Sequence, residues 1–431
     1  MLNHSFSINE KGHLTLSGVD TVELATEYGT PLYVLDENDI RNNCRQFKDA
    51  FQKYYEGNAK VYYASKAFSC LEMYRIANDE GICADVVSGG ELYTALAAGF
   101  PAERIGFHGN NKTPDELAFA IDSKVGNIIV DNITELELLN EIAKEKGVCQ
   151  KILLRIKPGI DCHTHDYIKT GQIDCKFGFA LENGEAFEAV ASACKLSNVE
   201  LIGIHCHIGS QIFETQPFAD AADIMIAFAK NIEQSLNKTL SEINFGGGYG
   251  IKYLETDKPV PKDESIRILC EEVKIACTKY GFSLPNISIE PGRSIVGDAN
   301  LTLYKIGNVK TIKDIRTYVS VDGGMSDNPR YALYQAEYEA VVANKAKEER
   351  DFVCTIAGKC CESGDLIQEH AKIQTPEAGD TLAVLATGAY NYSMASNYNR
   401  IPRPAAVMVR DGNARVIIKR ETYEDLINKD V

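Results

Sequence analysis

Four groups that could do chemistry follow short apolar segments of the sequence: Lys66, His207, the glycines at 246–248, and Glu290. A lysine at the mouth of a buried strand is either a surface cap or a desolvated amine, and a desolvated amine is suited to form a Schiff base. Three consecutive glycines after a strand let the backbone approach a ligand closely, and phosphate is the usual ligand of such a loop. The alternative for the glycines is a plain tight turn.

An amine and a phosphate loop together indicate pyridoxal phosphate, which needs both and also a partner for its pyridine nitrogen. Glu290 is placed to be that partner, because a carboxylate there would keep the ring nitrogen protonated. His207 could lie flat against the ring. Gly292 and Arg293, which follow Glu290 closely, could complete the phosphate site. The sequence therefore predicts a pyridoxal phosphate cofactor.

A metal site is the competing interpretation of the histidines. His205 and His207 would point to the same face of a strand, and the run 161–166 contains further metal-type ligands. However, a third ligand for the histidine pair has no obvious source, and a phosphate loop has no role in a mononuclear zinc site. The adjacent Cys360 and Cys361 have poor geometry for chelating one metal. We therefore expect no metal.

The elements that must position these groups repeat along the chain as a short apolar run, a turn and an amphipathic stretch. Such a repeat is typical of a (β/α)8 TIM-type barrel, whose active site lies at the C-terminal ends of the strands. An open doubly wound sheet gives the same local pattern, but the number of runs and the length favour the barrel. Pro114, and Thr134 with Glu137 in capping-box spacing, mark helix starts. The eight runs lie at 61–64, 82–87, 104–109, 127–131, 151–156, 200–208, 242–247 and 286–292.

The sequence pattern changes after residue 293. Segments there are short, rich in β-branched residues and bounded by Gly, Asp or Asn, which predicts a mostly antiparallel β-barrel or sandwich domain. Two segments within 11–35, GHLTLSG and TPLYVLD, look like strands of the same domain. We therefore expect an α/β chain with a barrel at 37–292 and a β domain assembled from 1–36 and 293–431.

Composition and charge exclude several classes of protein. The 431 residues are 45% hydrophobic and 25% charged, which is ordinary for a soluble globular protein. The net charge of −16 argues against binding nucleic acid or anionic membranes, both of which need a positive field. The 13 cysteines are scattered, and the first residues have no apolar signal core, so we expect a reduced, cytoplasmic protein.

The motifs resemble those of the pyridoxal-phosphate-dependent amino-acid decarboxylases of the alanine-racemase fold (fold type III). The resemblance covers nearly the whole chain, from about Pro31 to Pro404. Each of its motifs is weak alone, but together they are specific to the fold type. They are the segment 63–67 around Lys66, the segment 205–211 around His207, the glycines at 246–248, and the segment 290–293.

Further motifs are similar to the branch of this family that acts on meso-2,6-diaminopimelate. The segment 163–171 resembles its active-site loop, and 327–334 its substrate-carboxylate segment. In 361–365, Glu362 stands where ornithine decarboxylases carry Asp. Tyr331, where Pro is common, and the preceding Lys359–Cys360 depart from the pattern without removing a chemical group. The resemblance implies decarboxylation of meso-diaminopimelate to L-lysine and carbon dioxide, the last step of lysine biosynthesis.

The resemblance also implies roles for individual residues. Lys66 forms the Schiff base, His207 stacks on the ring, and Glu290 pairs with the ring nitrogen. Cys361 is the candidate proton donor, and Glu362 binds the distal ammonium of the substrate. Around the cofactor the resemblance also places Asp85, Arg155, Ser210, Gly246, Gly247, Gly248, Gly292, Arg293 and Tyr390, and in the substrate site it places Arg293, Arg330, Tyr334 and Tyr390.

In this family Cys361 and Glu362 would come from the partner subunit, so we expect a homodimer with shared active sites. One alternative is a decarboxylase of ornithine, arginine, lysine or carboxynorspermidine on the same fold, against which Arg330, Tyr334 and Glu362 argue. A racemase would carry Arg at the position of Glu290. Another alternative is a pyridoxal-phosphate-carrying or enzyme-like binding protein without catalysis, against which the intact Lys66, Cys361 and Glu362 argue.

Overall fold

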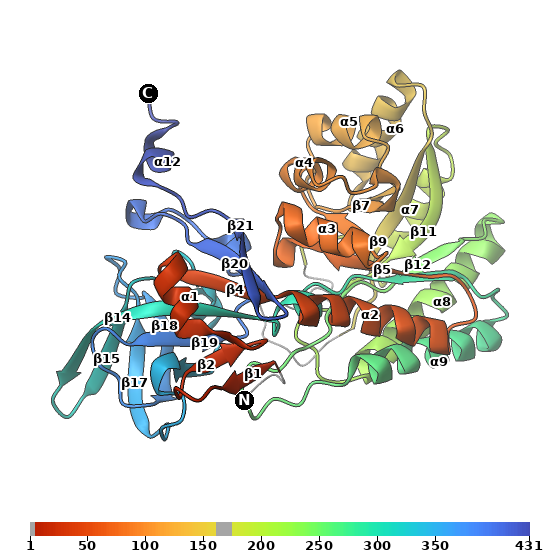
Figure 1. Cartoon of the computed structure of the whole chain (residues 1–431). Coiled ribbons are helices and arrows are strands. Elements are labelled where there is room, and N and C mark those ends of the chain that lie inside the picture. Colours follow the sequence, from red (N-terminus) through yellow and green to blue (C-terminus); the bar gives the residue numbers. More distant parts are fainter. Residues whose placement is uncertain (1–4, 161–174) are drawn as a thin grey trace. The chain divides into compact units, whose positions relative to one another are not determined.

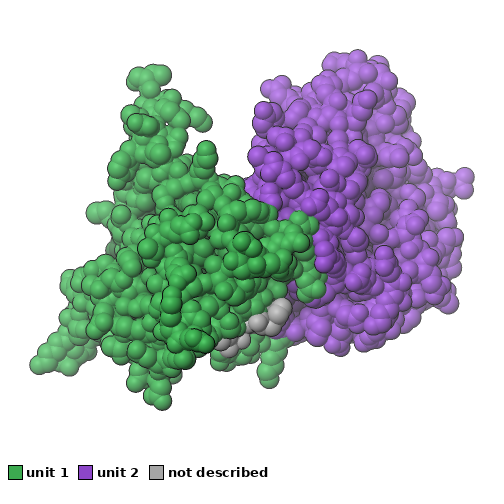
Figure 2. Space-filling model, in the orientation of Figure 1, with its two compact units in different colours: residues 1–42, 251–258, 293–431 green, residues 43–250, 259–292 purple. Residues whose placement is uncertain are grey.

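The computed structural model describes residues 5–160 and 175–431, so the predicted loop 163–171 and the run 161–166 lie outside the described residues. The chain forms two compact units, which Figure 2 colours separately. We call residues 43–250 and 259–292 the barrel unit, and residues 1–42, 251–258 and 293–431 the β unit. The domain boundaries expected from the sequence stay a prediction, because proximity alone does not show which part folds independently.

The barrel unit contains a closed barrel of parallel strands, so the barrel prediction is confirmed and the open sheet is wrong. The strands follow the order β9-β11-β12-β13-β5-β6-β7-β8, and β8 pairs with β9 to close the ring, while β10 (Phe179–Ala180) pairs with the last two residues of β9. Most residues of the strands are buried, and the apolar ones form the core of the barrel unit. They are β5 (Ala59–Ala64), β6 (Cys83–Val86), β7 (Ile105–Phe107), β8 (Asn127–Val130), β9 (Gln150–Lys157), β11 (Val199–His205), β12 (Glu242–Asn244) and β13 (Asn286–Ile289).

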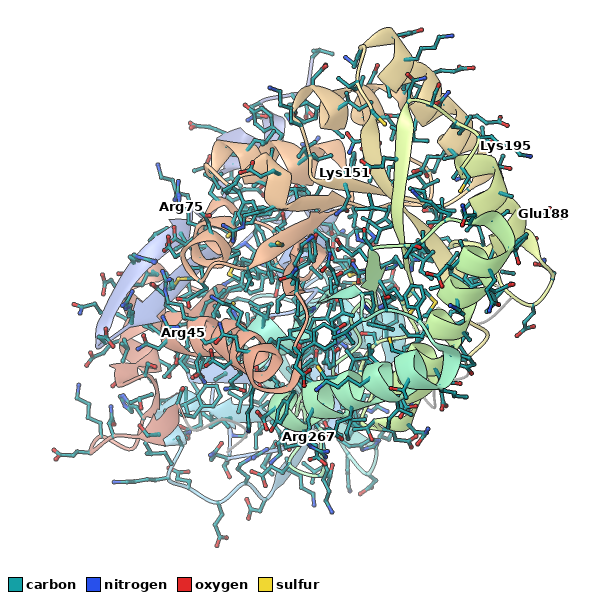
Figure 3. The ribbon with its side chains drawn as sticks, turned by 90° about the vertical axis from the view of Figure 1, so that its right-hand side faces the viewer. Arg45, Arg75, Lys151, Glu188, Lys195 and Arg267 are labelled. Carbon is teal, nitrogen blue, oxygen red and sulfur yellow. The ribbon has the colours of Figure 1, made fainter. Side chains whose placement is uncertain are left out.

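Helices follow the strands as the amphipathic stretches predict (Figure 1). Their outer faces are charged, and Figure 3 labels exposed examples such as Arg45, Arg75 and Glu188. The helices are α2 (Glu37–Tyr54), α3 (Leu71–Asp79), α4 (Gly89–Ala97), α5 (Pro114–Asp122), α6 (Ile133–Glu145), α7 (Glu185–Ala193), α8 (Gln216–Leu236) and α9 (Lys262–Tyr280). Among the described residues, no helix is both long and apolar enough to cross a membrane.

One predicted helix start is confirmed and one is wrong. Pro114 is the first residue of α5, behind a capping box made by Thr113 and Glu116. For α6, the cap is Asn132 instead of Thr134, and its side chain accepts from the Glu135 amide at 2.9 Å. The spacing fits both Asn132–Glu135 and Thr134–Glu137, and the earlier pair caps because Asn132 still has extended backbone after β8.

The β unit contains a large sheet of mixed direction. β14 (Asn300–Ile312) pairs antiparallel with β4 (Leu32–Asp36), β15 (Arg316–Val321) and β19 (Thr381–Leu385). β4 in turn pairs parallel with β20 (Ala405–Arg410), so strands from both chain ends lie side by side (Figure 1). The sheet is completed by β16 (Ala340–Val342), β17 (Phe352–Ala357), β18 (Leu366–Ile373) and β21 (Asn413–Ile418).

The N-terminal segment forms both predicted strands, in two different sheets of the β unit, and one helix that was not predicted. Of the two predicted strands, only TPLYVLD, as β4, enters the large sheet. GHLTLSG becomes β2 (Leu14–Leu16) of a separate sheet with β1 (Phe6–Ile8) and β3 (Val19–Asp20). The helix α1 (Thr21–Tyr28), capped by Asp20, was not predicted. It packs Leu24 and Ala25 into the same apolar cluster as β2 and β4, so tertiary packing decides its conformation.

Candidate active site

Lys66 lies directly beyond the first barrel strand. It occupies a 3-10 turn (Ser65–Ala67) between two buried neighbours, while its own side chain is exposed. The Ser65 hydroxyl donates to Glu91 Oε2 at 3.0 Å, and the same oxygen accepts from the Val87 amide at 2.8 Å. Because α4 anchors the turn through Glu91, the Lys66 amine stands on a rigid base.

Asp85 lies beside this turn with a buried, partly unsatisfied carboxyl group. It pairs in register with Ala64 of β5 and is 3% exposed. Burial raises the pKa of Asp85 well above its usual range, the charge of Glu290 raises it further, and Lys66 lowers it. Asp85 Oδ1 has no hydrogen-bond partner among the described residues. Such a buried atom is one that a bound group could satisfy.

Glu290, directly after β13, is held by three side chains. Asn244 Nδ2 donates to Oε1 at 2.7 Å, His108 Nε2 lies 2.8 Å from Oε1, and His205 Nε2 lies 3.0 Å from Oε2. Burial alone would raise the pKa of Glu290, but the two histidines outweigh it and hold the pKa well below its usual range. Glu290 is therefore a carboxylate anion at the barrel end.

The glycine segment packs too closely for any side chain. A Cβ on Gly246 would lie 2.4 Å from the Cys206 carbonyl oxygen, and one on Gly247 would lie 2.3 Å from the Glu290 carbonyl oxygen. The Gly247 amide donates to His207 Nδ1 at 3.2 Å. Burial, and the charges of Lys66 and Arg155, lower the pKa of His207 well below its usual range, so the ring is neutral. The loop thus orients the imidazole through the Gly247 amide.

The remaining predicted barrel residues frame these groups. Arg155 pairs in register with His205, and its guanidinium carbon lies 4.2 Å from the Phe177 ring centroid. Ser210 follows Gly209, whose carbonyl oxygen would lie 2.8 Å from a Cβ on Gly248. A Cβ on Gly292 would lie 2.9 Å from the Ala64 carbonyl oxygen, so β13 closes tightly on the turn of Lys66. All these residues lie at or beyond the C-terminal ends of barrel strands.

In the β unit, two predicted arginines share one tyrosine. Arg293 begins α10 (Arg293–Val296) and Arg330 begins α11 (Arg330–Tyr334), and both are buried. Arg293 donates to the Tyr253 hydroxyl, and the Arg330 guanidinium carbon lies 4.9 Å from the Tyr253 ring centroid. Tyr390 lies 4.9 Å from Arg293, measured from its ring centroid to the guanidinium carbon. Aromatic rings are good partners for guanidinium groups.

Arg330 is also fixed from its other side, since its Nη1 donates to the Tyr338 hydroxyl at 2.8 Å. Tyr334 ends α11 and is half-buried. Arg330 and Tyr334 therefore stand on one short helix.

Cys361 and Glu362 differ from the other predicted residues because both side chains are exposed. They lie on the turn between β17 and β18, which Asp365 holds in place. Asp365 accepts from the Met325 amide and the Cys360 amide, each at 2.6 Å. Asp365 therefore ties this turn to the segment that leads to Arg330, while Cys361 and Glu362 face outward.

Sequence reasoning missed His108, Asn244, Tyr253 and Tyr338. His108 had a signal, since it lies near the end of the predicted run 104–109, whereas Asn244 lies inside the predicted run 242–247. The tyrosines had none that spacing could reveal. Among the described residues, His108, His205 and Glu290 are also close enough to hold a metal, with ligand atoms within 4.8 Å of one another. These atoms instead pair with one another, and His207 is not among them.

The residues fit pyridoxal phosphate. The glycine segment offers bare backbone, Glu290 offers an anion, and Asp85 offers a buried oxygen with no partner among the described residues. Comparison with known proteins agrees. Residues 37–297 match the family described as pyridoxal-dependent decarboxylase, pyridoxal binding domain. The chain therefore belongs to the pyridoxal-dependent decarboxylases, and pyridoxal phosphate is its cofactor.

Full-length relatives define the branch within this class. The chain is 51% identical to diaminopimelate decarboxylase of Bacillus subtilis over 424 residues, covering 98% of this chain and 96% of the relative. It is 52% identical to that of Bacillus methanolicus over 414 residues, covering 96% of each. The structure of diaminopimelate decarboxylase from M. jannaschii in complex with L-lysine has a TM-score of 0.92, with 36% identity, over 100% of this chain and 99% of the other. The chain belongs to the diaminopimelate decarboxylase family.

Proposed function

We propose that this enzyme decarboxylates meso-2,6-diaminopimelate to L-lysine and carbon dioxide, with the site residues in the roles set out below. The observation that carries the proposal is the buried Glu290 anion, which stands at the same barrel end as Lys66 and the glycine segment. When bound, a protonated pyridine ring delocalises the electron pair that remains after carbon dioxide leaves. A carboxylate is the partner that such a ring needs.

The barrel unit would bind the cofactor. The Lys66 amine would attach to its carbonyl carbon, Glu290 would hold a proton at the ring nitrogen, and neutral His207 would lie against the ring face. Asp85 and Arg155 would border the reacting end. The phosphate would lie against backbone and side chains of Ser210, Gly246, Gly247, Gly248, Gly292, Arg293 and Tyr390.

The β unit would recognise the end of the substrate that does not react. Arg293, Arg330, Tyr334 and Tyr390 would bind the distal carboxylate, because a guanidinium pairs with a carboxylate through two parallel hydrogen bonds. Glu362 would bind the distal ammonium. Ornithine and lysine lack the distal carboxylate and would leave the buried Arg330 without its ligand, so the site would discriminate against them.

Cys361 and Glu362 would act from the partner subunit of a homodimer, with Cys361 returning a proton to the former α carbon. Their exposure on a well-anchored turn supports this arrangement. We also propose that the enzyme works in the cytoplasm, where its free cysteines stay reduced.

The test measures carbon dioxide release from purified protein supplied with pyridoxal phosphate. We expect release with meso-diaminopimelate, little with ornithine or lysine, and none from Lys66→Ala. Equal release from ornithine would overturn the substrate assignment.

To test the shared site, inactive Lys66→Ala and Cys361→Ala proteins are mixed and allowed to exchange subunits. Random exchange should restore about a quarter of wild-type activity, since half of the dimers then carry one complete site. No recovery despite demonstrated exchange would contradict the shared site.

A further inference from the structure

Two histidines from different strands meet at one carboxylate. His108 follows β7 and His205 ends β11, yet their ring centroids lie 4.9 Å apart with an interplanar angle of 68°. The two Nε2 atoms lie 2.8 and 3.0 Å from different oxygens of Glu290. Asn244 donates to Glu290 Oε1. Both oxygens therefore face neighbouring nitrogen donors.

Both histidines are buried and uncharged. His108 is 6% and His205 is 1% exposed. Burial lowers the pKa of both imidazoles, and that of His205 falls to about 4. His205 Nδ1 is buried and has no hydrogen-bond partner among the described residues, so the proton of the neutral ring belongs on Nε2, where Glu290 accepts it.

Two cations of the barrel unit, Arg155 and Lys112, contact groups other than Glu290. Arg155 stacks on Phe177, with Nη1 3.9 Å from Asp131. Lys112 donates to Glu135 at 2.7 Å and to the Ile129 carbonyl at 2.7 Å. Glu290 is therefore contacted by neutral donors rather than paired with a cation.

We propose that His108 and His205 are positioning residues that fix Glu290 toward the ring nitrogen of the cofactor and preserve its negative charge for that nitrogen. The inference rests on the proposed function, in which Glu290 pairs with the ring. A cationic partner would hold Glu290 equally well but would cancel the charge that keeps the ring protonated. Neutral imidazoles stabilise the anion and fix its plane without supplying an opposing charge.

The test compares binding of two cofactors to cofactor-free protein: pyridoxal phosphate and its 1-deaza analogue, in which C–H replaces the ring nitrogen. Affinities are measured by absorbance titration in wild type and in His108→Leu, His205→Leu and His205→Gln. Wild type should prefer pyridoxal phosphate. His205→Leu should lose about tenfold of that preference, because it removes a hydrogen bond to a charged group, and His108→Leu should lose a smaller part, because it removes a nitrogen that lies 2.8 Å from Glu290 Oε1. The glutamine variant, which keeps a donor near the Nε2 position, should retain the preference within about twofold.

A merely structural role predicts a different result. If leucine weakened both cofactors in parallel, so that the preference stayed at the wild-type value, the inference would be wrong. A second readout is the 15N chemical shift of ring-labelled pyridoxal phosphate bound to each protein. It should report a protonated ring in wild type and His205→Gln, and loss of that proton in the leucine variants. An unchanged shift in the leucine variants would also contradict the inference.

Failure of the proposed function gives a separate signature. If borohydride did not fix the cofactor to Lys66 in wild type, the proposed function would fail before any histidine variant was compared.

Discussion

The two units place their predicted residues by different physical means. In the barrel unit, Lys66, His207, the glycines and Glu290 come from strand ends, and neighbouring parallel strands bring those ends together. In the β unit, Arg293 and Arg330 are fixed by tyrosines from separate segments. The residues proposed to bind the cofactor thus follow from topology, whereas those proposed to bind the substrate depend on side-chain packing. We therefore expect substitutions that disturb the backbone to have the largest effect in the barrel unit, and substitutions of side chains to have the largest effect in the β unit.

The largest expected effect comes from adding one methyl group to the barrel unit. Gly247→Ala would place a Cβ 2.3 Å from the Glu290 carbonyl oxygen, where neither backbone can yield. We expect a loss of about 4 kcal/mol or more in stability, together with loss of pyridoxal phosphate binding. The matched control is Gly90→Ala in α4, where the nearest atom outside the helix backbone is 3.7 Å away. Thermal unfolding and cofactor titration measure both, and normal binding by Gly247→Ala would break the comparison.

A change of pH should alter the free energy of unfolding contributed by one group in each unit, and in opposite directions. Burial raises the pKa of Asp327, in the β unit, to about 7. Between roughly pH 4 and 7 the folded protein therefore holds a proton that the unfolded chain has lost, so the free energy of unfolding contributed by Asp327 falls as pH rises. His205, with its pKa lowered to about 4, gives the opposite sign, because its contribution is lost as pH falls from about 6.5 to 4.

Asp327→Asn isolates the β-unit contribution. Its unfolding temperature relative to wild type should rise from pH 4 to pH 7 and stay level above that. The exposed Asp314→Asn serves as the control, since Asn tolerates the positive φ of 60° at that position. If the difference in unfolding temperature between Asp327→Asn and wild type did not vary with pH, Asp327 would not have the role assigned to it here.

Arg330→Lys should sharpen the division between substrate and cofactor. Lysine cannot make the two parallel hydrogen bonds of a guanidinium or keep the contacts with Tyr253 and Tyr338. We expect kcat/KM for meso-diaminopimelate to fall by about 10- to 100-fold with pyridoxal phosphate affinity unchanged. Arg316→Lys, at a partly exposed ion pair with Glu369, should behave as wild type. Weakened cofactor binding in Arg330→Lys would contradict the division.

The smallest effect should come from Tyr253→Phe, which keeps the ring between both arginines but removes the hydroxyl that accepts from Arg293. We expect a change in KM of about threefold, since one hydrogen bond is lost while packing remains. Tyr253→Leu should raise KM further, because the ring contacts are lost as well. Equal KM values for the two variants would show that the ring contributes nothing.

The fold was predictable to the extent that it depends on local pattern. All eight barrel strands overlap the predicted runs, and five lie entirely within them, because buried parallel strands are short and rich in apolar residues. Helix α1 was missed because its burial depends on distant strands, and the cap of α6 because two residue pairs satisfy the same spacing.

The site was predictable only where strand ends converge. The sequence pattern places His108 near a strand end, but nothing in the spacing indicates that its Nε2 contacts Glu290. Tyr253 follows the barrel's glycine segment closely in sequence, yet packs with Arg293 and Arg330. The assigned roles of Cys361 and Glu362 depend on a second chain, which no pattern within one chain can place.

The excursion of residues 251–258 has a consequence for how such enzymes can be recombined. The chain passes between the units four times, at 42/43, 250/251, 258/259 and 292/293. Ile251 and Tyr253 belong to the apolar cluster of the β unit. A continuous fragment ending at the last barrel strand would therefore carry orphaned apolar residues, while the complementary fragment would lack part of its interior. If one unit is exchanged between homologues, residues 251–258 must be exchanged together with the rest of the β unit, as a separate segment.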